Sequence, residues 1–306
     1  MSKPYFMGIF ISIIIFMSSL TIPLNNSFTL AEAQQQKEQL ETTFSTKNVT
    51  DLTKANEKNS NIKLENKTVN YYINSSGYLV YPTKSSLSSI ENNISSTNKN
   101  NILPAIVMIH ENKGLNDNIK NIANLLAKEG YVVLAVDLFN GEVTTDQKRS
   151  SEITQHIRNN PTIAIENLKS ARTYLSSLQN VNPDKIASLG WCFGGQQSLQ
   201  LALNSDKEHP LAATVIYYGR LVTEPQTLSK IQWPILGIFG DKDQSITVDS
   251  VKKFEDALNS NDIPNEIYIY KGVGHAFANP SGDNYAPQET QDAWEKTISF
   301  LKKYLS

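Results

Sequence analysis

Short apolar runs alternate with segments of helical periodicity from residue 105 to the C-terminus. Short isolated apolar runs predict buried strands, and apolar residues that recur every three to four positions predict amphipathic helices. The predicted strands span 105–109, 131–137, 185–190, 212–218, 234–240 and 266–270. The predicted helices span 116–129, 161–179, 194–204, 248–261 and 287–304. This alternation predicts an α/β fold: a mostly parallel central sheet with helices on both faces, and ligands beyond the carboxyl ends of the strands.

The region before residue 105 has a different character. The stretch "KTVNYYINSSGYLVYPT" (67–83) holds two strand-like runs around a polar turn, which predicts a β-hairpin. The polar tract 83–101 is expected to be an extended surface loop. Residues 34–61 are polar, contain few apolar side chains and are expected to be a disordered linker. The folded domain is therefore predicted to span 62–306.

The N-terminus has the pattern of an export segment. Lys3 precedes an apolar stretch from Tyr5 to Leu24, and Ala31-Glu32-Ala33 has the small-x-small form of a signal-peptidase site. Residues 1–33 are expected to be a signal peptide, or an uncleaved membrane anchor because the apolar stretch is long enough to span a bilayer. Both alternatives export the domain. We expect an extracellular location, with possible membrane attachment through this segment.

Composition narrows the chemistry. The 306 residues carry a net charge of −2, so no electrostatic pattern predicts nucleic-acid binding. The single cysteine excludes an intrachain disulfide and a structural zinc site of four cysteines. We expect a monomer that acts on a small molecule.

That cysteine occupies a significant position. Cys192 lies in "SLGWCFGG", on the predicted turn between strand 185–190 and helix 194–204. Gly190-x-Cys192-x-Gly194 is the nucleophile-elbow pattern, in which small residues let the strand and helix pack closely. The helix dipole favours negative charge there, and the Phe193 N–H would be one oxyanion donor. The alternative is a buried structural cysteine, the commonest fate of a free thiol. The strand-turn-helix context favours a nucleophile.

A base and a carboxylate follow in the expected order. His275 lies in "KGVGHAFANP", on a loop after a late strand, whereas His156 and His209 are expected at the surface. The carboxylate should follow an intervening strand, where Asp241 and Asp243 both lie just beyond strand 234–240. Asp243 is preferred because a turn separates it from the strand. Asp241 is expected to cap that turn.

Taken together, these segments resemble the dienelactone hydrolase family of α/β-hydrolases. The resemblance runs from Tyr78 to Leu305 and rests on "VMIHENKGLND", "GYVVLAVDLF", "GWCFGG", "GDKD" and "GVGHAF". It implies the α/β-hydrolase fold and carboxylic ester hydrolysis of the carboxymethylenebutenolidase type. This reaction needs no metal or organic cofactor.

The resemblance also implies roles for two further residues. Glu111 matches the family's glutamate near the nucleophile. In that family the resting thiol is neutral and turned away from the histidine, until substrate binding lets the glutamate take its proton. A thiolate formed only on substrate binding is better protected from oxidation. The backbone N–H of Asn112 would supply the second oxyanion donor.

The substrate pocket is less well defined. Characterised family members bind a substrate carboxylate with two arginines, one of them shortly after the catalytic histidine. Asn279 stands where that arginine is expected, which makes an anionic lactone a less certain substrate. Arg149 and Arg220 are the remaining candidates for a second arginine. The aromatic candidates for the pocket rim are Trp191, Tyr217 and Tyr218, of which at least one tyrosine is expected in the core.

The predicted function is therefore an exported, cysteine-dependent hydrolase that cleaves a lactone or small ester through a thioester. Two alternatives remain open. One is an acyltransferase or peptidase on the same fold. The other is a non-catalytic exported binding module.

Overall fold

The computed structural model of the chain describes residues 61–91 and 102–306. The predicted export segment 1–33 and the predicted linker, except residue 61, lie outside the described residues. Within the described ranges, the helices are too short or too polar to cross a membrane.

The described chain forms one eight-stranded sheet in the order β1-β2-β4-β3-β5-β6-β7-β8. The strands are β1 (Leu64–Tyr72), β2 (Ser75–Pro82), β3 (Leu103–Ile109), β4 (Val132–Val136), β5 (Val181–Trp191), β6 (Ala213–Tyr217), β7 (Ile235–Gly240) and β8 (Asn265–Tyr270). β1 and β2 form the predicted antiparallel hairpin, and β2 pairs antiparallel with β4. The other neighbouring strands are parallel, which confirms the predicted sheet.

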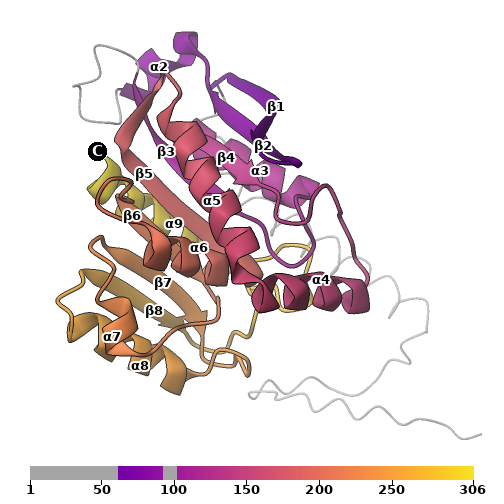
Figure 1. Ribbon diagram of the computed structural model, residues 1–306, viewed down its shortest axis with the longest axis vertical. Coiled ribbons are helices and arrows are strands. Elements are labelled where there is room, and N and C mark those ends of the chain that lie inside the picture. The colour runs from indigo at the N-terminus through magenta and orange to yellow at the C-terminus, as the bar shows by residue number, and fades with distance from the viewer. Residues whose placement is uncertain (1–60, 92–101) are drawn as a thin grey trace, which may run out of the picture. The chain divides into compact units, whose positions relative to one another are not determined.

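Helices cover both faces of this sheet. They are α2 (Lys84–Glu91), α3 (Asp117–Lys128), α4 (Gln147–Asn159), α5 (Pro161–Ser176), α6 (Phe193–Asn204), α7 (Pro225–Leu228), α8 (Val248–Asn259) and α9 (Pro287–Leu305). Figure 1 shows α5 and α6 across the near face of the sheet, with α3 and α9 behind it. The buried hydrophobic side chains form two clusters. Helices α5, α6 and α8 contribute to one cluster, and α3 and α9 contribute to the other.

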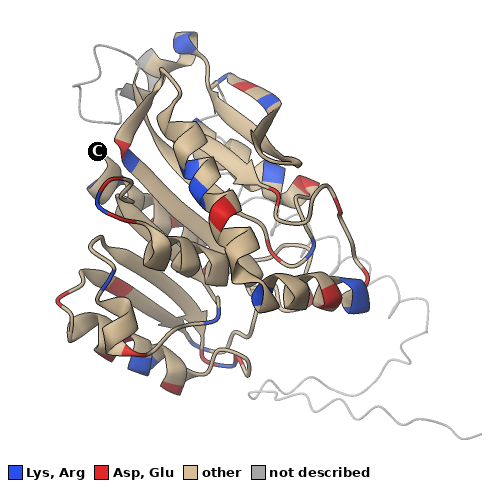
Figure 2. Cartoon of the chain, in the orientation of Figure 1, with Lys and Arg blue, Asp and Glu red and all other residues tan. Residues whose placement is uncertain are grey.

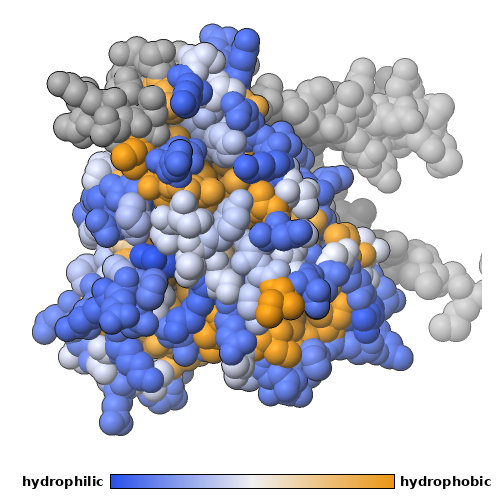
Figure 3. Space-filling view, turned by 45° about the horizontal axis from the view of Figure 1, so that its top comes forward, coloured by the Kyte–Doolittle hydropathy of each residue, from blue (hydrophilic) through white to orange (hydrophobic). Residues whose placement is uncertain are grey.

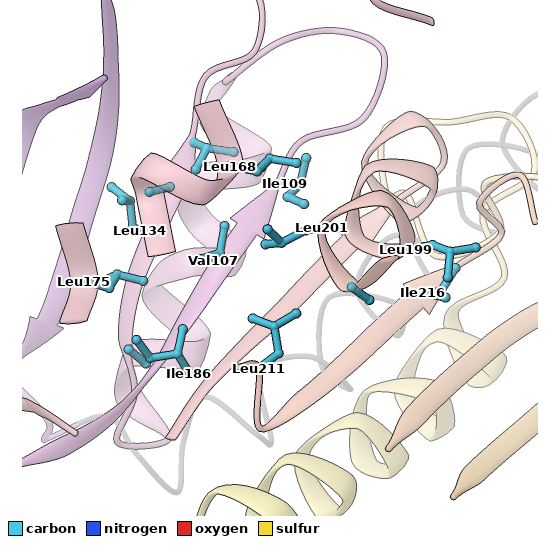
Figure 4. Close-up of a cluster of buried hydrophobic side chains, with 14 of the residues drawn as sticks. Val107, Ile109, Leu134, Leu168, Leu175, Ile186, Leu199, Leu201, Leu211 and Ile216 are labelled. Atoms are coloured by element: carbon cyan, nitrogen blue, oxygen red, sulfur yellow. The ribbon is translucent and has the colours of Figure 1, made fainter. Parts of the chain in front are cut away.

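The core is built on central strands that carry no charge. Residues of β3, β4, β6 and β7 are all uncharged, and Figure 2 shows the acidic and basic residues mainly on helices and loops. Parallel strands buried on both faces require such continuous apolar runs. Figure 4 shows how Val107 and Ile109 of β3 lie among leucines of α5 and α6. On the face shown in Figure 3, hydrophobic residues occur in patches among hydrophilic ones.

The polar tract 83–101 is not a loop throughout, contrary to our prediction. Residues Lys84–Glu91 form α2, whereas 92–101 lie outside the described residues. The helix forms because Leu87 and Ile90, three positions apart, are each 6% exposed and pack against the core. Their apolar contribution is easily missed among the surrounding serines.

α4 covers the polar stretch around His156, which the sequence indicates to be helical but whose bounds no apolar periodicity defines. Its sequence is polar, and few of its residues are buried. It begins at a clear N-cap, because the carboxylate of Asp146 accepts a hydrogen bond from the Arg149 N–H at 2.6 Å. This cap, rather than an apolar stripe, marks the start of the helix.

We predict that Leu168→Ala lowers the free energy of unfolding by about 3 kcal/mol, because it leaves a cavity where α5 packs on the sheet. Leu168 is fully buried. The control on the same helix is Ile163→Ala, since Ile163 is 45% exposed; its cost should stay below about 0.5 kcal/mol. Urea denaturation measures both, and equal losses would contradict the packing of α5 described here.

Candidate active site

The turn from β5 to α6 holds Cys192 in a strained backbone conformation. Its φ is 54° and its ψ is −114°, a region that residues other than glycine rarely occupy. A Cβ atom on Gly190 would lie 2.2 Å from the Gly194 carbonyl oxygen. One on Gly194 would lie 2.3 Å from the Ile109 carbonyl oxygen. The flanking glycines are therefore required by backbone contacts, and the turn presents the thiol at the carboxyl end of the sheet.

Cys192, His275 and Asp243 form a continuous hydrogen-bonded relay. The His275 Nε2 atom lies 3.0 Å from the Cys192 Sγ, and its Nδ1 lies 2.7 Å from Oδ2 of Asp243. The other carboxylate oxygen, Oδ1, accepts the N–H groups of Ser245 at 2.8 Å and Ile246 at 3.0 Å. Asp243 is thus held in place by two backbone N–H groups as well as by the imidazole.

The neighbouring carboxylate has a different partner. Asp241 accepts the Gly272 N–H at 2.7 Å and joins the turn after β7 to the turn after β8. The structure therefore brings Asp243 to the histidine and leaves Asp241 in a turn, as the order of the residues predicts.

The pKa values of His275 and Asp243 are both shifted within the relay. Burial lowers the pKa of His275, but the hydrogen bonds to Asp243 and Cys192 outweigh burial and raise it to about 10. Burial raises the pKa of Asp243, yet the bonds from His275 and the backbone hold it below its ordinary value. The arrangement favours an imidazolium next to a carboxylate.

Two backbone N–H groups are available beside the thiol. Phe193 is the first residue of α6, so its N–H has no acceptor within the helix. The Asn112 N–H donates no hydrogen bond in the described part of the chain. Its carbonyl is held by the Ser150 hydroxyl at 2.6 Å. These are the two donors that the sequence pattern and the family resemblance suggest.

A buried histidine fixes the loop that carries Asn112, and our sequence reasoning missed it. His110 Nε2 accepts the Leu138 N–H at 3.1 Å, so Nδ1 carries the proton and donates to the Glu111 carbonyl at 2.5 Å. Burial lowers the pKa of His110, in agreement with this neutral form. The sequence feature that could have pointed to His110 is its position in "IHENKG", directly before Glu111.

Glu111 lies in a buried polar cluster, but it does not contact the thiol. Its Oε1 accepts the Tyr218 hydroxyl at 3.3 Å, and its Oε2 accepts the side-chain amide of Asn279. Burial raises the pKa of Glu111. The expected resting state, with the thiol turned away from the histidine, is not the one observed. The thiol is bonded to His275, which Asp243 already holds in place, while neutral donors occupy both Glu111 oxygens.

The aromatic candidates separate into two groups. Trp191 is 4% exposed, and its ring packs 5.4 Å from that of Tyr217. Both tyrosines are buried, at 2% exposure for Tyr217 and 1% for Tyr218, and the Tyr217 hydroxyl bonds to Thr297 at 2.7 Å. Tyr218 instead lies edge-on to His275, with ring centroids 5.3 Å apart. Of the three, Tyr218 is in direct contact with the relay.

The arginine candidates also separate. Arg149 is exposed and its guanidinium bonds Glu142 at 2.6 and 2.7 Å, so its charge is already paired. Arg158, which we did not predict, lies 5.8 Å above the Phe193 ring and donates to Gln196 at 3.0 Å. It interacts electrostatically with both Cys192 and Arg220. Arg158 and Arg220 are therefore cationic groups within electrostatic range of each other, with Arg158 also in range of the thiol, and we refer to this pair as the cationic side of the site. Arg149 is paired elsewhere.

The described residues show no metal centre. Within 61–91 and 102–306, no group of three or more His, Cys, Asp or Glu side chains is arranged to hold a metal ion. The acid, base and thiol in this cluster bond to one another instead.

The parallel sheet, the elbow and the relay after successive strands define an α/β-hydrolase. The chain belongs to the dienelactone hydrolase family, because the sequence model of that family matches residues 93–305. This family comprises carboxylic ester hydrolases, and the chain is therefore a hydrolase of that class.

Individual relatives agree with this assignment. A protein of Saccharolobus solfataricus, assigned by name as a carboxymethylenebutenolidase, is 31% identical over 242 residues, which cover 65% of this chain and 89% of that protein. A Bradyrhizobium protein, named as a lactonase of 2-oxo-3-(5-oxofuran-2-ylidene)propanoate, is 28% identical over 214 residues, 66% of this chain and 85% of its own. A dienelactone hydrolase-like promiscuous phosphotriesterase from metagenomic libraries shares the fold, with a TM-score of 0.67 at 22% identity over 79% of this chain and 98% of its own.

The raised pKa of His275 predicts a pH-dependent stability contribution. The imidazolium is favoured in the folded state, so its contribution is fully present below the ordinary pKa of 6.5 and is lost as the pH rises through about 10. The difference in free energy of unfolding between the parent and His275→Gln should therefore shrink between about pH 7 and about pH 11. In the Cys192→Ala background the decline should be smaller and should end at lower pH, because only Asp243 then holds the imidazolium and the pKa of His275 in the folded state is raised less. A difference that stays constant over this range would refute the shift.

Proposed function

We propose that the protein cleaves a lactone or small carboxylic ester through a thioester formed on Cys192. The observation that carries this proposal is the hydrogen-bonded relay from Asp243 through His275 to a thiol on a strained elbow. A base in hydrogen-bond contact with a nucleophile, itself oriented by a third group, is the arrangement that nucleophilic catalysis requires.

Before the first step, the thiol proton moves to Nε2 of His275, which gives a thiolate beside an imidazolium, and the raised pKa of that ring favours this pair. The Cys192 thiolate then attacks the acyl carbon. The carbonyl oxygen becomes an oxyanion, for which the Phe193 and Asn112 N–H groups are the proposed donors. When the tetrahedral intermediate collapses, the carbon–oxygen bond of the ester breaks. The imidazolium returns its proton to the leaving oxygen, and the acyl group remains on sulfur.

In the second step, His275 takes a proton from water, and the resulting hydroxide attacks the thioester carbon. The carbon–sulfur bond then breaks, the carboxylic acid is released, and the sulfur regains its proton from the imidazolium. Asp243 holds the ring in one orientation throughout and stabilises its positive charge. The raised pKa of His275 supports this role, because it favours the protonated ring that each collapse needs.

Glu111 has a positioning role in this proposal. Its two oxygens join Tyr218, which packs against the His275 ring, to Asn279, four residues after that histidine. The carboxyl group thereby connects the loop after β3 to the loop that carries the base. It need not accept the proton of the thiol, because His275 lies at hydrogen-bond distance from the sulfur.

The natural substrate is proposed to carry an anionic group. Arg158 lies close enough to interact with both Arg220 and Cys192, and the two like charges of the arginines repel each other. An anion bound between them would relieve that repulsion. The Bradyrhizobium relative is named for a lactone that bears a carboxylate, which is a substrate of this chemical class.

We further propose that the enzyme acts outside the cell. Support comes from the sequence of residues 1–33, in which a basic start, an apolar stretch and a small-x-small site follow in the order of an export signal.

Replacement of the nucleophile should abolish turnover. We expect Cys192→Ala to reduce p-nitrophenyl acetate hydrolysis to background, and Asp243→Asn to lower kcat by about 10²–10⁴-fold. The matched control is Asp241→Asn, which alters the neighbouring turn carboxylate and should stay within about twofold of the parent. Mass spectrometry of acid-quenched Asp243→Asn should detect an acetyl group on Cys192. Full activity of Cys192→Ala would exclude the thioester route.

The two arginines should discriminate between anionic and neutral substrates. Arg158→Gln and Arg220→Gln should each raise KM for a carboxylate-bearing dienelactone about tenfold, because each removes a charged hydrogen-bond donor. KM for neutral p-nitrophenyl acetate should change less than about twofold. Arg149→Gln is the control, since its guanidinium is paired with Glu142. Equal effects on both substrates would argue against an anion site.

A further inference from the structure

A cavity of about 160 Å³ lies between α3 and α9, beside the candidate active site. Residues of the first three turns of each helix form its sides, and the carboxyl ends of β5 and β6 also line it. The lining residues are Asn118, Asn121, Ile122, Leu125, Trp191, Tyr217, Ala278, Pro280, Thr290 and Trp294.

This cavity is distinct from the catalytic relay. Cys192, His275, Asp243 and Glu111 do not line it. It adjoins the relay through the backbone only, because Trp191 precedes the nucleophile and Ala278 precedes the amide that holds Glu111. A molecule in the cavity would therefore leave the thiol uncovered.

The lining selects for a flat apolar body. Trp191, Tyr217 and Trp294 present three aromatic side chains, and Ile122 and Leu125 supply aliphatic surface opposite them. Aromatic faces and edges favour stacked or edge-on contacts with another ring. A cavity of about 150 Å³ lined by apolar side chains accepts benzene. The volume here fits a single six-membered ring with a small substituent.

The polar groups of the lining indicate what that substituent would be. The Thr290 hydroxyl donates to the Ala286 carbonyl at 2.7 Å, and the Tyr217 hydroxyl bonds to Thr297, so neither needs a ligand. The side-chain amides of half-buried Asn118 and exposed Asn121 form no hydrogen bond within the described part of the chain, so they lie at the mouth of the cavity and are free to bind a ligand in place of water. They lie three positions apart on α3 and so share one side of the helix.

The lining also contains no charged side chain. An ionised ligand would lose its hydration without gaining a counter-charge, which disfavours anions and cations alike. A hydroxyl or carbonyl group can instead pair with an asparagine amide. This preference is opposite to that of the cationic side of the active site.

We propose that this cavity is a second small-molecule site, which binds a neutral monocyclic compound carrying one hydroxyl or carbonyl group. Its ring lies among Trp191, Tyr217 and Trp294, and its polar group meets Asn118 or Asn121. Such a site meets the usual description of a ligand pocket: concave, mostly apolar, with few polar groups that set orientation. It operates independently of the thiol, so it does not depend on the proposed reaction.

The test uses 4-fluorophenol as the probe and fluorine NMR of the full chain as the readout. We expect a saturable shift with a Kd on the order of 1 mM, as is usual for so small a ligand. The parent protein alkylated at Cys192 with iodoacetamide should bind equally well. The anionic analogue 4-fluorobenzoate should bind at least about tenfold more weakly.

Variants locate the probe. Ile122→Trp fills the cavity and should weaken binding at least about tenfold, whereas Ile163→Trp, on the surface of α5, should leave binding unchanged. Leu125→Phe is a smaller filling substitution that replaces Ile122→Trp if near-UV circular dichroism shows that the latter is unfolded. No saturable shift, equal binding by the filled variant, or loss of binding on alkylation would each overturn the proposal. The last result would place the probe at the catalytic thiol.

Discussion

The site depends on one backbone constraint, the sharp turn that joins β5 to α6. Cys192 is held at φ 54°, a conformation that costs on the order of 1–3 kcal/mol and persists only where surrounding structure enforces it. Backbone atoms supply that enforcement. The Cys192 N–H bonds to the Tyr217 carbonyl at 3.0 Å, and Gly194 packs directly on the carbonyl of Ile109. Neighbouring strands of the parallel sheet therefore hold the thiol in place. The stability of the core thus also fixes the position of the thiol.

The electrostatics of the site follow from where the charges are paired. Asp243 is buried, but it is satisfied by two backbone N–H groups and the imidazole, so its charge is retained. Glu111 is buried with neutral donors only, and its pKa rises. The pKa values of these two carboxyl groups are thus shifted in opposite directions. Asp243 stabilises positive charge on the His275 ring, whereas Glu111 links the loops around that ring.

Much of this arrangement was predictable from the sequence. The strand and helix pattern gave the parallel sheet, because apolar runs and amphipathic periods reflect burial directly. The order of Cys192, Asp243 and His275 along the chain, each just beyond a strand, was enough to predict that these side chains lie together. Arg158 was not predictable in this way. It lies on a polar helix with no apolar stripe, and its place beside the thiol depends on how α4 packs against α6. The Glu111 contacts were equally hidden, since they join residues 168 positions apart.

Asn279 is an uncharged partner for the carboxyl group of Glu111. An amide can bond the Glu111 carboxylate, but it contributes no charge to neutralise it. Burial raises the pKa of Glu111, and its two oxygens are already occupied by the Tyr218 hydroxyl and the Asn279 amide. Under these conditions the base that remains within reach of Sγ is His275. A positive charge that interacts with the sulfur is supplied by Arg158, and in the proposed function the same guanidinium binds an anionic substrate.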